Sequence, residues 1–252
     1  MKLYDEIIDG WSALLKDFSL RSLPLSSLWP DTGERNMILR SDMAYELGGG
    51  LLPALGATAV TVGGFAEDRL LLCGPDLPEI LLDGPYARLT VASVKDGLPD
   101  QGGALYQAIK KIDFVRYHVN PEGFMTRISA IQGRESARVS REALKKGLTF
   151  AQVGGRMLAS YHENPQIQAV RLIYITDPAF PYGELEALVK KSREITRAID
   201  HAMTAAMTDC NVCSLKKVCD EVEGIRQLFL MQQQPRTSLR STLFPYTTLF
   251  QG

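Results

Sequence analysis

The chain has 252 residues, of which 45% are hydrophobic and 23% charged, and its formal net charge is −1. This balance is ordinary for a globular protein and does not favour binding to nucleic acid or to an anionic membrane surface. The acidic N-terminus lacks the apolar stretch of a signal peptide, and no segment is apolar for long enough to cross a bilayer. We therefore expect a cytoplasmic protein whose thiols stay reduced.

The first part of the chain predicts one helix followed by short strands. Apolar residues recur on one helical face between residues 3 and 18. A loop rich in Ser and Pro follows, so residues 1–34 are expected to form an N-terminal helix and linker. Short apolar runs then predict strands at 37–39, 57–62, 70–73, 79–82 and 87–94.

The middle of the chain mixes helices with strands. Its patterns predict helices at 103–117, 135–146, 150–161 and 182–207, and strands at 123–131 and 168–176. The expected fold is therefore of the mixed α/β (α+β) class, with a central mixed sheet flanked by helices. We expect this domain to cover residues 35–207, and a cysteine motif at 208–229 to follow it.

Three cysteines lie close together after the last predicted helix. Cys210, Cys213 and Cys219 fall in one short run, and Cys73 is the one other cysteine of the four in the chain. Thiolates are soft ligands that suit iron–sulfur clusters and zinc. The spacing therefore predicts a metal site, with a [4Fe–4S] cluster favoured over zinc. Cys73 lies in an apolar run, which is typical of an inert core thiol.

Alternatives remain open for this motif. A zinc site needs four ligands, and His201 and Asp209 could add to the three thiolates. A redox dithiol is less favoured, because the Cys-x2-Cys pair follows a long helix where the thioredoxin arrangement opens one. Lys216 and Lys217 lie between the cysteines and would offset the negative charge of thiolate ligands.

A group of arginines offers a candidate anion site. Arg134, Arg138 and Arg141 recur at helical spacing and would line one face. Such a face could contact the phosphates of a nucleotide-like ligand such as coenzyme A. The alternative is a solvated helix face on which Glu135 and Glu142 balance the arginines.

Several short motifs, taken in order, resemble one protein family. They are Glu46-Leu-Gly-Gly49, Gly74-Pro-Asp-Leu77, Met125-x-Arg127-Ile-Ser129, an apolar run ending near Thr176-Asp177, and a charged segment leading into Cys-x2-Cys. Together, over about residues 37–213, the chain resembles the acetyl-CoA synthase beta subunit of the carbon monoxide dehydrogenase/acetyl-CoA synthase complex. The chain would be a shorter paralogue or a truncated form of that subunit.

The resemblance implies a role in the one-carbon metabolism of an anaerobe, the acetyl-CoA (Wood–Ljungdahl) pathway. Cys210 and Cys213 would match the first two cluster cysteines of the family, whereas Cys219 departs from its spacing. The family's nickel-binding Cys-Gly-Cys motif is absent from the sequence. An accessory or electron-transfer role is therefore expected, with carbon monoxide dehydrogenase, corrinoid protein subunits or another redox protein as partner. The alternative function is a non-enzymatic interaction domain with a structural zinc knuckle.

The C-terminal segment is treated separately. Residues of about 236–250 resemble translated sequencing-adapter DNA and share no periodicity with what precedes them. We therefore expect residues 230–252 to be a non-native tail. On this interpretation the natural chain continues differently, and a fourth metal ligand would lie in that continuation.

Overall fold

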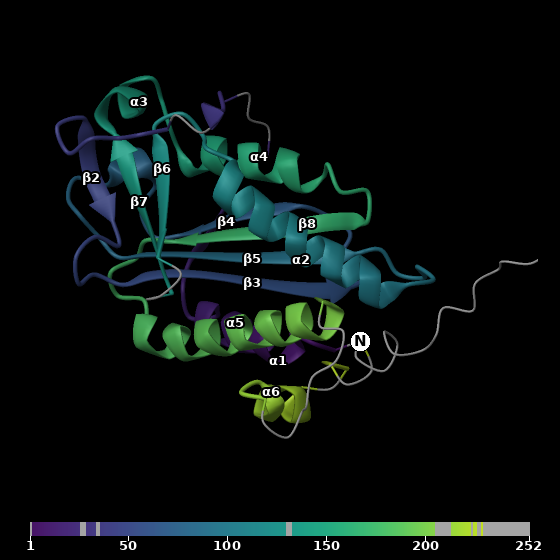
Figure 1. Ribbon diagram of the computed structural model, residues 1–252. Coiled ribbons are helices and arrows are strands. Elements are labelled where there is room, and N and C mark those ends of the chain that lie inside the picture. The colour runs from purple at the N-terminus through teal and green to yellow at the C-terminus, as the bar shows by residue number, and fades with distance from the viewer. Residues whose placement is uncertain are drawn as a thin grey trace, which may run out of the picture.

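The computed structural model describes residues 2–25, 29–33, 36–129, 133–204, 213–222, 224–225 and 228. It contains one five-stranded mixed sheet and one three-stranded antiparallel sheet, with helices on both faces of the larger sheet (Figure 1). The predicted mixed α/β class is confirmed. No helix within these residues is long and apolar enough to cross a membrane.

The larger sheet has the strand order β1-β4-β8-β5-β3. Parallel pairing joins β4 to β8 and β5 to β3, whereas β1 with β4 and β8 with β5 are antiparallel. Every residue of β5 is buried, including the polar Arg88, Thr90 and Ser93. The strands are β1 (Leu20–Leu23), β3 (Ala54–Val62), β4 (Arg69–Cys73), β5 (Tyr86–Val94) and β8 (Ile167–Ile175).

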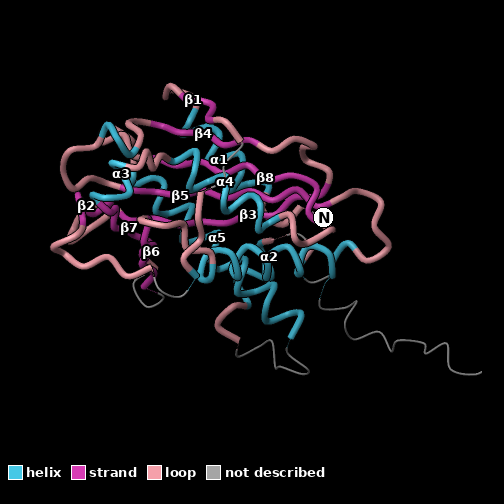
Figure 2. The backbone as a smooth tube through the Cα atoms, turned by 90° about the horizontal axis from the view of Figure 1, so that it is seen from above, coloured by secondary structure: helices cyan, strands magenta, loops and turns pink. Residues whose placement is uncertain are grey.

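Four helices cover this sheet. In Figure 1, α1 (Asp5–Leu15) and α5 (Tyr182–Thr204) lie on one side, and α2 (Gln101–His118) and α4 (Phe150–Tyr161) on the other. The view from above in Figure 2 superimposes α1 on α4 and α5 on α2, as expected for opposite faces. Ile7 and Trp11 of α1 are buried in the same core as the sheet. The N-terminal helix is thus part of the main hydrophobic core.

The contact between α4 and β4 explains one glycine. A Cβ added to Gly154 would lie 2.4 Å from the Leu70 side chain, well inside van der Waals contact. Glycine therefore lets the helix approach the strand closely.

The smaller sheet corrects one prediction. It has the order β2-β7-β6, from β2 (Met43–Leu47), β6 (Phe124–Ser129) and β7 (Arg134–Ser140). The predicted helix at 135–146 is wrong over its first half, because β7 occupies residues 134–140 and only α3 (Arg141–Lys145) is helical. Burial alternates along β7, with Glu135, Ala137 and Val139 facing inward. This period of two is typical of a strand, whereas the spacing of the arginines had indicated a helix.

Two short strand predictions are also wrong. Residues 37–39 have no regular structure, and β2 begins at Met43 instead. The segment 79–82 is not a strand, because a 3-10 helix occupies Leu77–Glu79. Asp76 and Glu79 form a capping box around that turn, and such a local polar signal overrides a short apolar run.

The remaining predicted elements are present within a few residues, except that two predicted ends, residues 130–131 of the strand at 123–131 and 205–207 of the last helix, lie outside the described residues. The short edge strand β1 was not predicted. A final helix, α6 (Lys216–Glu221), packs against α5 and carries the cysteine segment (Figure 1).

Candidate functional site

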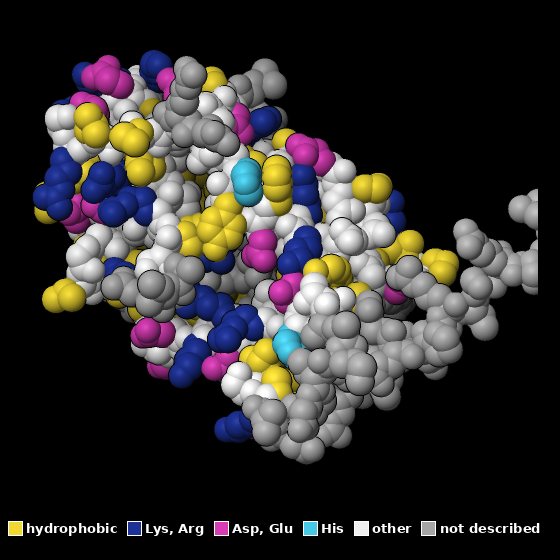
Figure 3. Space-filling view, in the orientation of Figure 1, with side chains coloured by type: hydrophobic (Ala, Val, Ile, Leu, Met, Phe, Trp, Pro, Cys, Tyr) yellow, Lys and Arg dark blue, Asp and Glu magenta, His cyan; other side chains and the backbone are white. Residues whose placement is uncertain are grey.

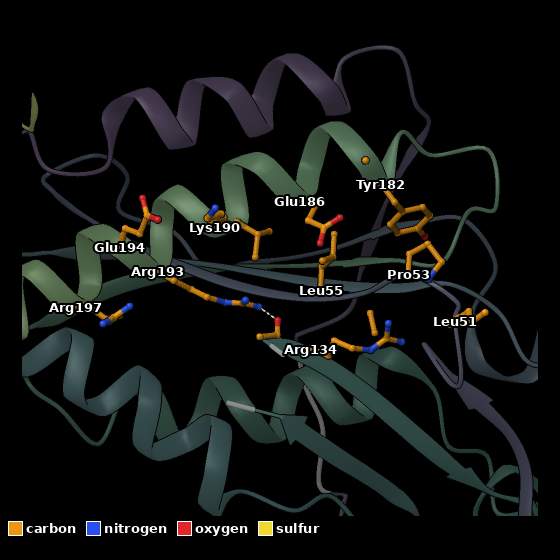
Figure 4. Close-up of a pocket in the computed structure, with 14 residues that line it drawn as sticks. Leu51, Pro53, Leu55, Arg134, Tyr182, Glu186, Lys190, Arg193, Glu194 and Arg197 are labelled. Carbon is orange, nitrogen blue, oxygen red and sulfur yellow. Dashed lines mark hydrogen bonds between the residues drawn. The ribbon is translucent and has the colours of Figure 1, made fainter. Parts of the chain in front are cut away.

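A groove follows one side of α5, where the helix passes the N-terminal end of β3 and the start of β7. Its cavity has a volume of about 620 Å³. Figure 4 shows its labelled side chains, which come from α5 on one wall and from the residues around β3 and β7 on the other. Leu51, Pro53 and Leu55 line one end of the cavity together with Arg134, whereas Lys190, Arg193 and Arg197 of α5 extend toward the other end (Figure 4).

Four cations line this α5 groove: Arg134, Lys190, Arg193 and Arg197. Lys and Arg side chains gather over α5 on the face seen in Figure 3, with acidic side chains among them. Two carboxylates, Glu186 and Glu194, also line the cavity. Within the described part of the chain, none of the four cations forms an ion pair with a carboxylate. The groove therefore has more positive than negative charge.

Two of these arginines are held by backbone carbonyls. Arg134 donates to the carbonyl oxygens of Gly48 and Leu52, at 2.8 and 2.7 Å. Arg193 reaches across from α5 and donates to the carbonyl of Gly133, the contact drawn as a dashed line in Figure 4. These bonds fix the two guanidinium groups without neutralising them.

A largely buried ion network lies beside the groove, under the opposite face of β3. Arg88 binds Glu135 through two hydrogen bonds, at 2.6 and 3.0 Å, and both side chains have 0% exposure. Arg116 adds a third bond to the same carboxylate at 2.7 Å. Although burial opposes ionisation, the two arginines outweigh it and lower the pKa of Glu135. Gly56 leaves room for this carboxylate, because a Cβ there would overlap it.

The groove and the network influence each other through Arg193. Burial lowers the pKa of Arg193, and the nearby charge of Arg116 lowers it further, against smaller opposing effects of Glu135 and Glu186. Arg193 is therefore a cation in an unfavourable environment, because the charge of Glu135 is already shared by Arg88 and Arg116.

A second cavity of about 620 Å³ lies between α5 and α6. It shares Lys190, Glu194 and Arg197 with the α5 groove, so the two cavities adjoin along the helix. Its other wall comes from α6 and the residues before it, among them Ser214, Leu215 and Lys217. The cysteine segment thus adjoins a cavity that four cations and two carboxylates line.

The structure places two of the three predicted metal ligands. Cys213 lies just before α6, and its carbonyl accepts a hydrogen bond from the Lys216 amide at 3.1 Å. Cys219 lies on α6 and packs partly buried against the hydrophobic core. Cys210 lies outside the described residues, as does Asp209, so the predicted three-thiolate site stays a prediction.

The lysines expected to offset thiolate charge have carboxylate partners on their own helix. Lys216 pairs with Asp220 at 2.7 Å, and Lys217 lies 3.7 Å from Glu221. Both lysine side chains are substantially exposed. Surface pairs of this kind are weak, so these lysines still contribute positive charge near the segment.

The three arginines predicted to share a helix face do not share one. Arg134 lines the α5 groove from the start of β7. Arg138 binds the Ile38 carbonyl at 3.1 Å and lies 3.5 Å from Glu46. Arg141 donates to the carbonyls of Ser41 and Met43 at the start of α3. Arg138 and Arg141 thus tie β2 and the segment before it to β7 and α3, and Arg134 alone faces the groove.

Three groove cations were missed in the sequence. The sequence predicts Lys190, Arg193 and Arg197 only as part of the helix at 182–207. Their spacing of three and then four residues places them on one side of α5. That spacing was a usable signal, but the sequence does not show that this side faces a cavity.

Cys73 is buried with 0% exposure at the end of β4. Burial, with a smaller effect of the Asp177 charge, raises the pKa of its thiol to about 11. This environment agrees with the predicted inert core thiol and separates Cys73 from the C-terminal cysteines.

Comparison with known proteins adds no identification. No protein-family model matches the chain, and no curated protein matches it at a significant level.

Proposed function

We propose that this protein is an iron–sulfur protein of one-carbon metabolism, similar to the acetyl-CoA synthase beta subunit, in which Cys210, Cys213 and Cys219 bind a [4Fe–4S] cluster. Its role would be accessory or electron-transferring. The supporting observation is the packing of α6 along α5, which holds Cys213 and Cys219 beside a cavity lined by cations.

This environment suits a cluster bound by thiolates. Thiolate ligation concentrates negative charge, and nearby positive charge influences the reduction potential of a cluster. The cavity between α5 and α6 has two cations more than carboxylates, since Glu194 and Glu221 line it together with Lys190, Lys191, Arg197 and Lys217. The partial burial of Cys219 supports a site that is only partly open to solvent.

Partners and location belong to the same proposal. A carbon monoxide dehydrogenase, a corrinoid protein subunit or another redox protein would exchange electrons or one-carbon units with this chain in the cytoplasm. Coenzyme A is the further cofactor that the resemblance implies. Because the sequence lacks the nickel-binding Cys-Gly-Cys motif, acetyl-CoA synthesis by this chain alone is not proposed.

Metal analysis after anaerobic purification tests the proposal. The expected protein is brown and contains iron and acid-labile sulfide but no stoichiometric nickel. Cys213→Ser should lose most of the iron, whereas the matched control Cys73→Ala, which also removes one thiol, should keep it. A colourless protein with one zinc per chain would contradict the proposal and support the alternative of a structural zinc knuckle in an interaction domain.

A further inference from the structure

β6 forms one edge of the smaller sheet, and part of its backbone points away from the sheet (Figure 1). The Ser140 amide donates to the carbonyl of Gly123, the residue opposite it just before β6. Bonded and non-bonded pairs alternate along antiparallel strands. Thr126 and Ile128 therefore direct their N–H and C=O groups outward, away from β7.

This β6 edge is closed at its start and open farther along. The Phe124 amide donates to the Pro121 carbonyl, and the Phe124 carbonyl accepts a hydrogen bond from the Asn36 side chain at 2.8 Å. Among the described residues, no group bonds the outward N–H or C=O of Thr126 or Ile128. The Thr126 hydroxyl is buried and has no partner within the same part of the chain. An open strand edge is a template for pairing with a further strand.

The other strand edges in the described chain offer less. α5 covers the edge of β3, where the Ser192 side chain donates to the Thr58 carbonyl. The end of β2 is bridged to the segment at Gly84, whose carbonyl accepts a hydrogen bond from the Gly48 amide at 2.7 Å. β1 has four residues, and so short an edge strand presents few groups for pairing.

A small polar cavity of about 260 Å³ adjoins the β6 edge. It lies on the face of the smaller sheet that points away from the core, and Arg127 and Ser129 of β6 line it. Arg127 and Arg138 share the carboxylate of Glu46, whereas Arg134 bonds carbonyl oxygens. These three arginines and one glutamate leave an excess of two positive charges. Lys and Arg side chains accordingly gather over the smaller sheet in Figure 3.

We propose that the β6 edge binds an extended segment of a partner protein in which acidic and apolar residues alternate. The segment pairs with the free backbone groups of Thr126 and Ile128 and adds a fourth strand to the three of the smaller sheet. Because side chains alternate between the two faces of a strand, its acidic residues lie beside Arg127, and one carboxylate enters the small cavity. Its apolar residues extend the core-facing side next to Ile128.

A second copy of this chain is a poorer occupant. Antiparallel pairing of two β6 strands through both free residues places the Arg127 side chains of the two copies directly opposite each other. Like charges at opposed positions destabilise a strand pair, so charge complementarity favours an acidic partner. The surface contains no cysteine and no residue of α5, so this inference goes beyond the proposed function and does not depend on it.

Fluorescence anisotropy on the full chain tests the proposal with a labelled peptide of sequence Val-Glu-Val-Glu-Val-Glu. The matched control peptide has lysine in place of each glutamate. The acidic peptide should bind, with an affinity that falls as the salt concentration rises, and the lysine peptide should not. Hydrogen exchange followed by nuclear magnetic resonance should slow at the Thr126 and Ile128 amides when the acidic peptide binds. The Met125 and Arg127 amides, which already face β7, should change less.

Variants identify the edge. Thr126→Pro removes one outward N–H and keeps the ladder to β7, because proline is tolerated where an edge N–H faces outward. It should lose most of the peptide binding. Arg127→Gln should weaken binding by about tenfold. Lys145→Gln removes an exposed positive charge on α3 and should bind the peptide as the unsubstituted protein does.

Three results would overturn the proposal. The first is no change of anisotropy with the acidic peptide at low salt. The second is peptide binding that leaves exchange at Thr126 and Ile128 unchanged, a measurement that stays decisive even if Thr126→Pro fails to fold. The third is a dimer in analytical ultracentrifugation that dissociates in a folded Thr126→Pro variant, because the edge would then belong to a second copy.

Discussion

The buried Arg88–Glu135–Arg116 network and the α5 groove use the same residue type in opposite ways. In the network, two arginines surround one carboxylate, and the Arg88 and Glu135 side chains have 0% exposure. In the groove, Arg134 and Arg193 bind only neutral carbonyls, and the cations face a cavity. In the network a carboxylate offsets the charge of the arginines, whereas in the groove carbonyl oxygens orient them and leave their charge facing the cavity.

The largest expected effect comes from breaking the network. Glu135→Gln leaves Arg88 buried without a counter-charge, so we expect the free energy of unfolding to fall by about 3–5 kcal/mol. Urea denaturation measures this loss. The control Glu142→Gln removes one partner of an exposed pair with Lys145 and should cost far less. Equal losses in the two variants would show that the buried network stabilises the protein no more than an exposed ion pair does.

Acid should reveal the same network more gradually. The pKa of Glu135 is lowered in the folded protein from its ordinary value of 4.5, so the unfolded chain takes up this proton first. The stabilisation is therefore complete above pH 4.5 and is lost as the pH falls toward the lowered pKa. The difference in unfolding free energy between the unsubstituted protein and Glu135→Gln should shrink over this range. A difference that stays constant would contradict the assignment.

The smallest effect on stability is expected in the groove. Arg197 is exposed and has no carboxylate partner among the residues that the structure describes. Arg197→Gln should therefore change the free energy of unfolding by less than about 0.5 kcal/mol. Thermal unfolding followed by circular dichroism measures this. A loss approaching that of Glu135→Gln would mean that Arg197 has a structural role, and the contrast between the two regions would fail.

Local sequence patterns predicted the long elements well. The apolar residues of α1, α2, α4 and α5 recur at helical spacing. Mostly apolar runs mark the buried strands β3, β5 and β8. The prediction failed at β7, where Arg134 and Arg138 lie four residues apart, a spacing that suits a helix face and one side of a strand equally. The pairing of β7 with β2 and β6 decided between them, and pairing between distant segments is not visible in a local pattern.

The candidate site was only partly predictable for the same reason. The cysteine motif is local in sequence, so its residue types could be recognised directly. The groove joins Arg134 at the start of β7 to Arg193 and Arg197 on α5, far away in the chain. The role of Glu135 depends on Arg88 and Arg116, which come from two further elements. Such charge relations appear only when the strands and helices are assembled.

The proposal of an iron–sulfur cluster in the cysteine segment is tested most directly by electron paramagnetic resonance. The anaerobically purified protein is measured after reduction with dithionite. A [4Fe–4S] cluster bound by Cys210, Cys213 and Cys219 should give a signal from the reduced, paramagnetic cluster. That signal should vanish when all three cysteines are replaced by serine and persist in Cys73→Ala. A reduced protein that gives no such signal and retains one zinc per chain would contradict the iron–sulfur assignment.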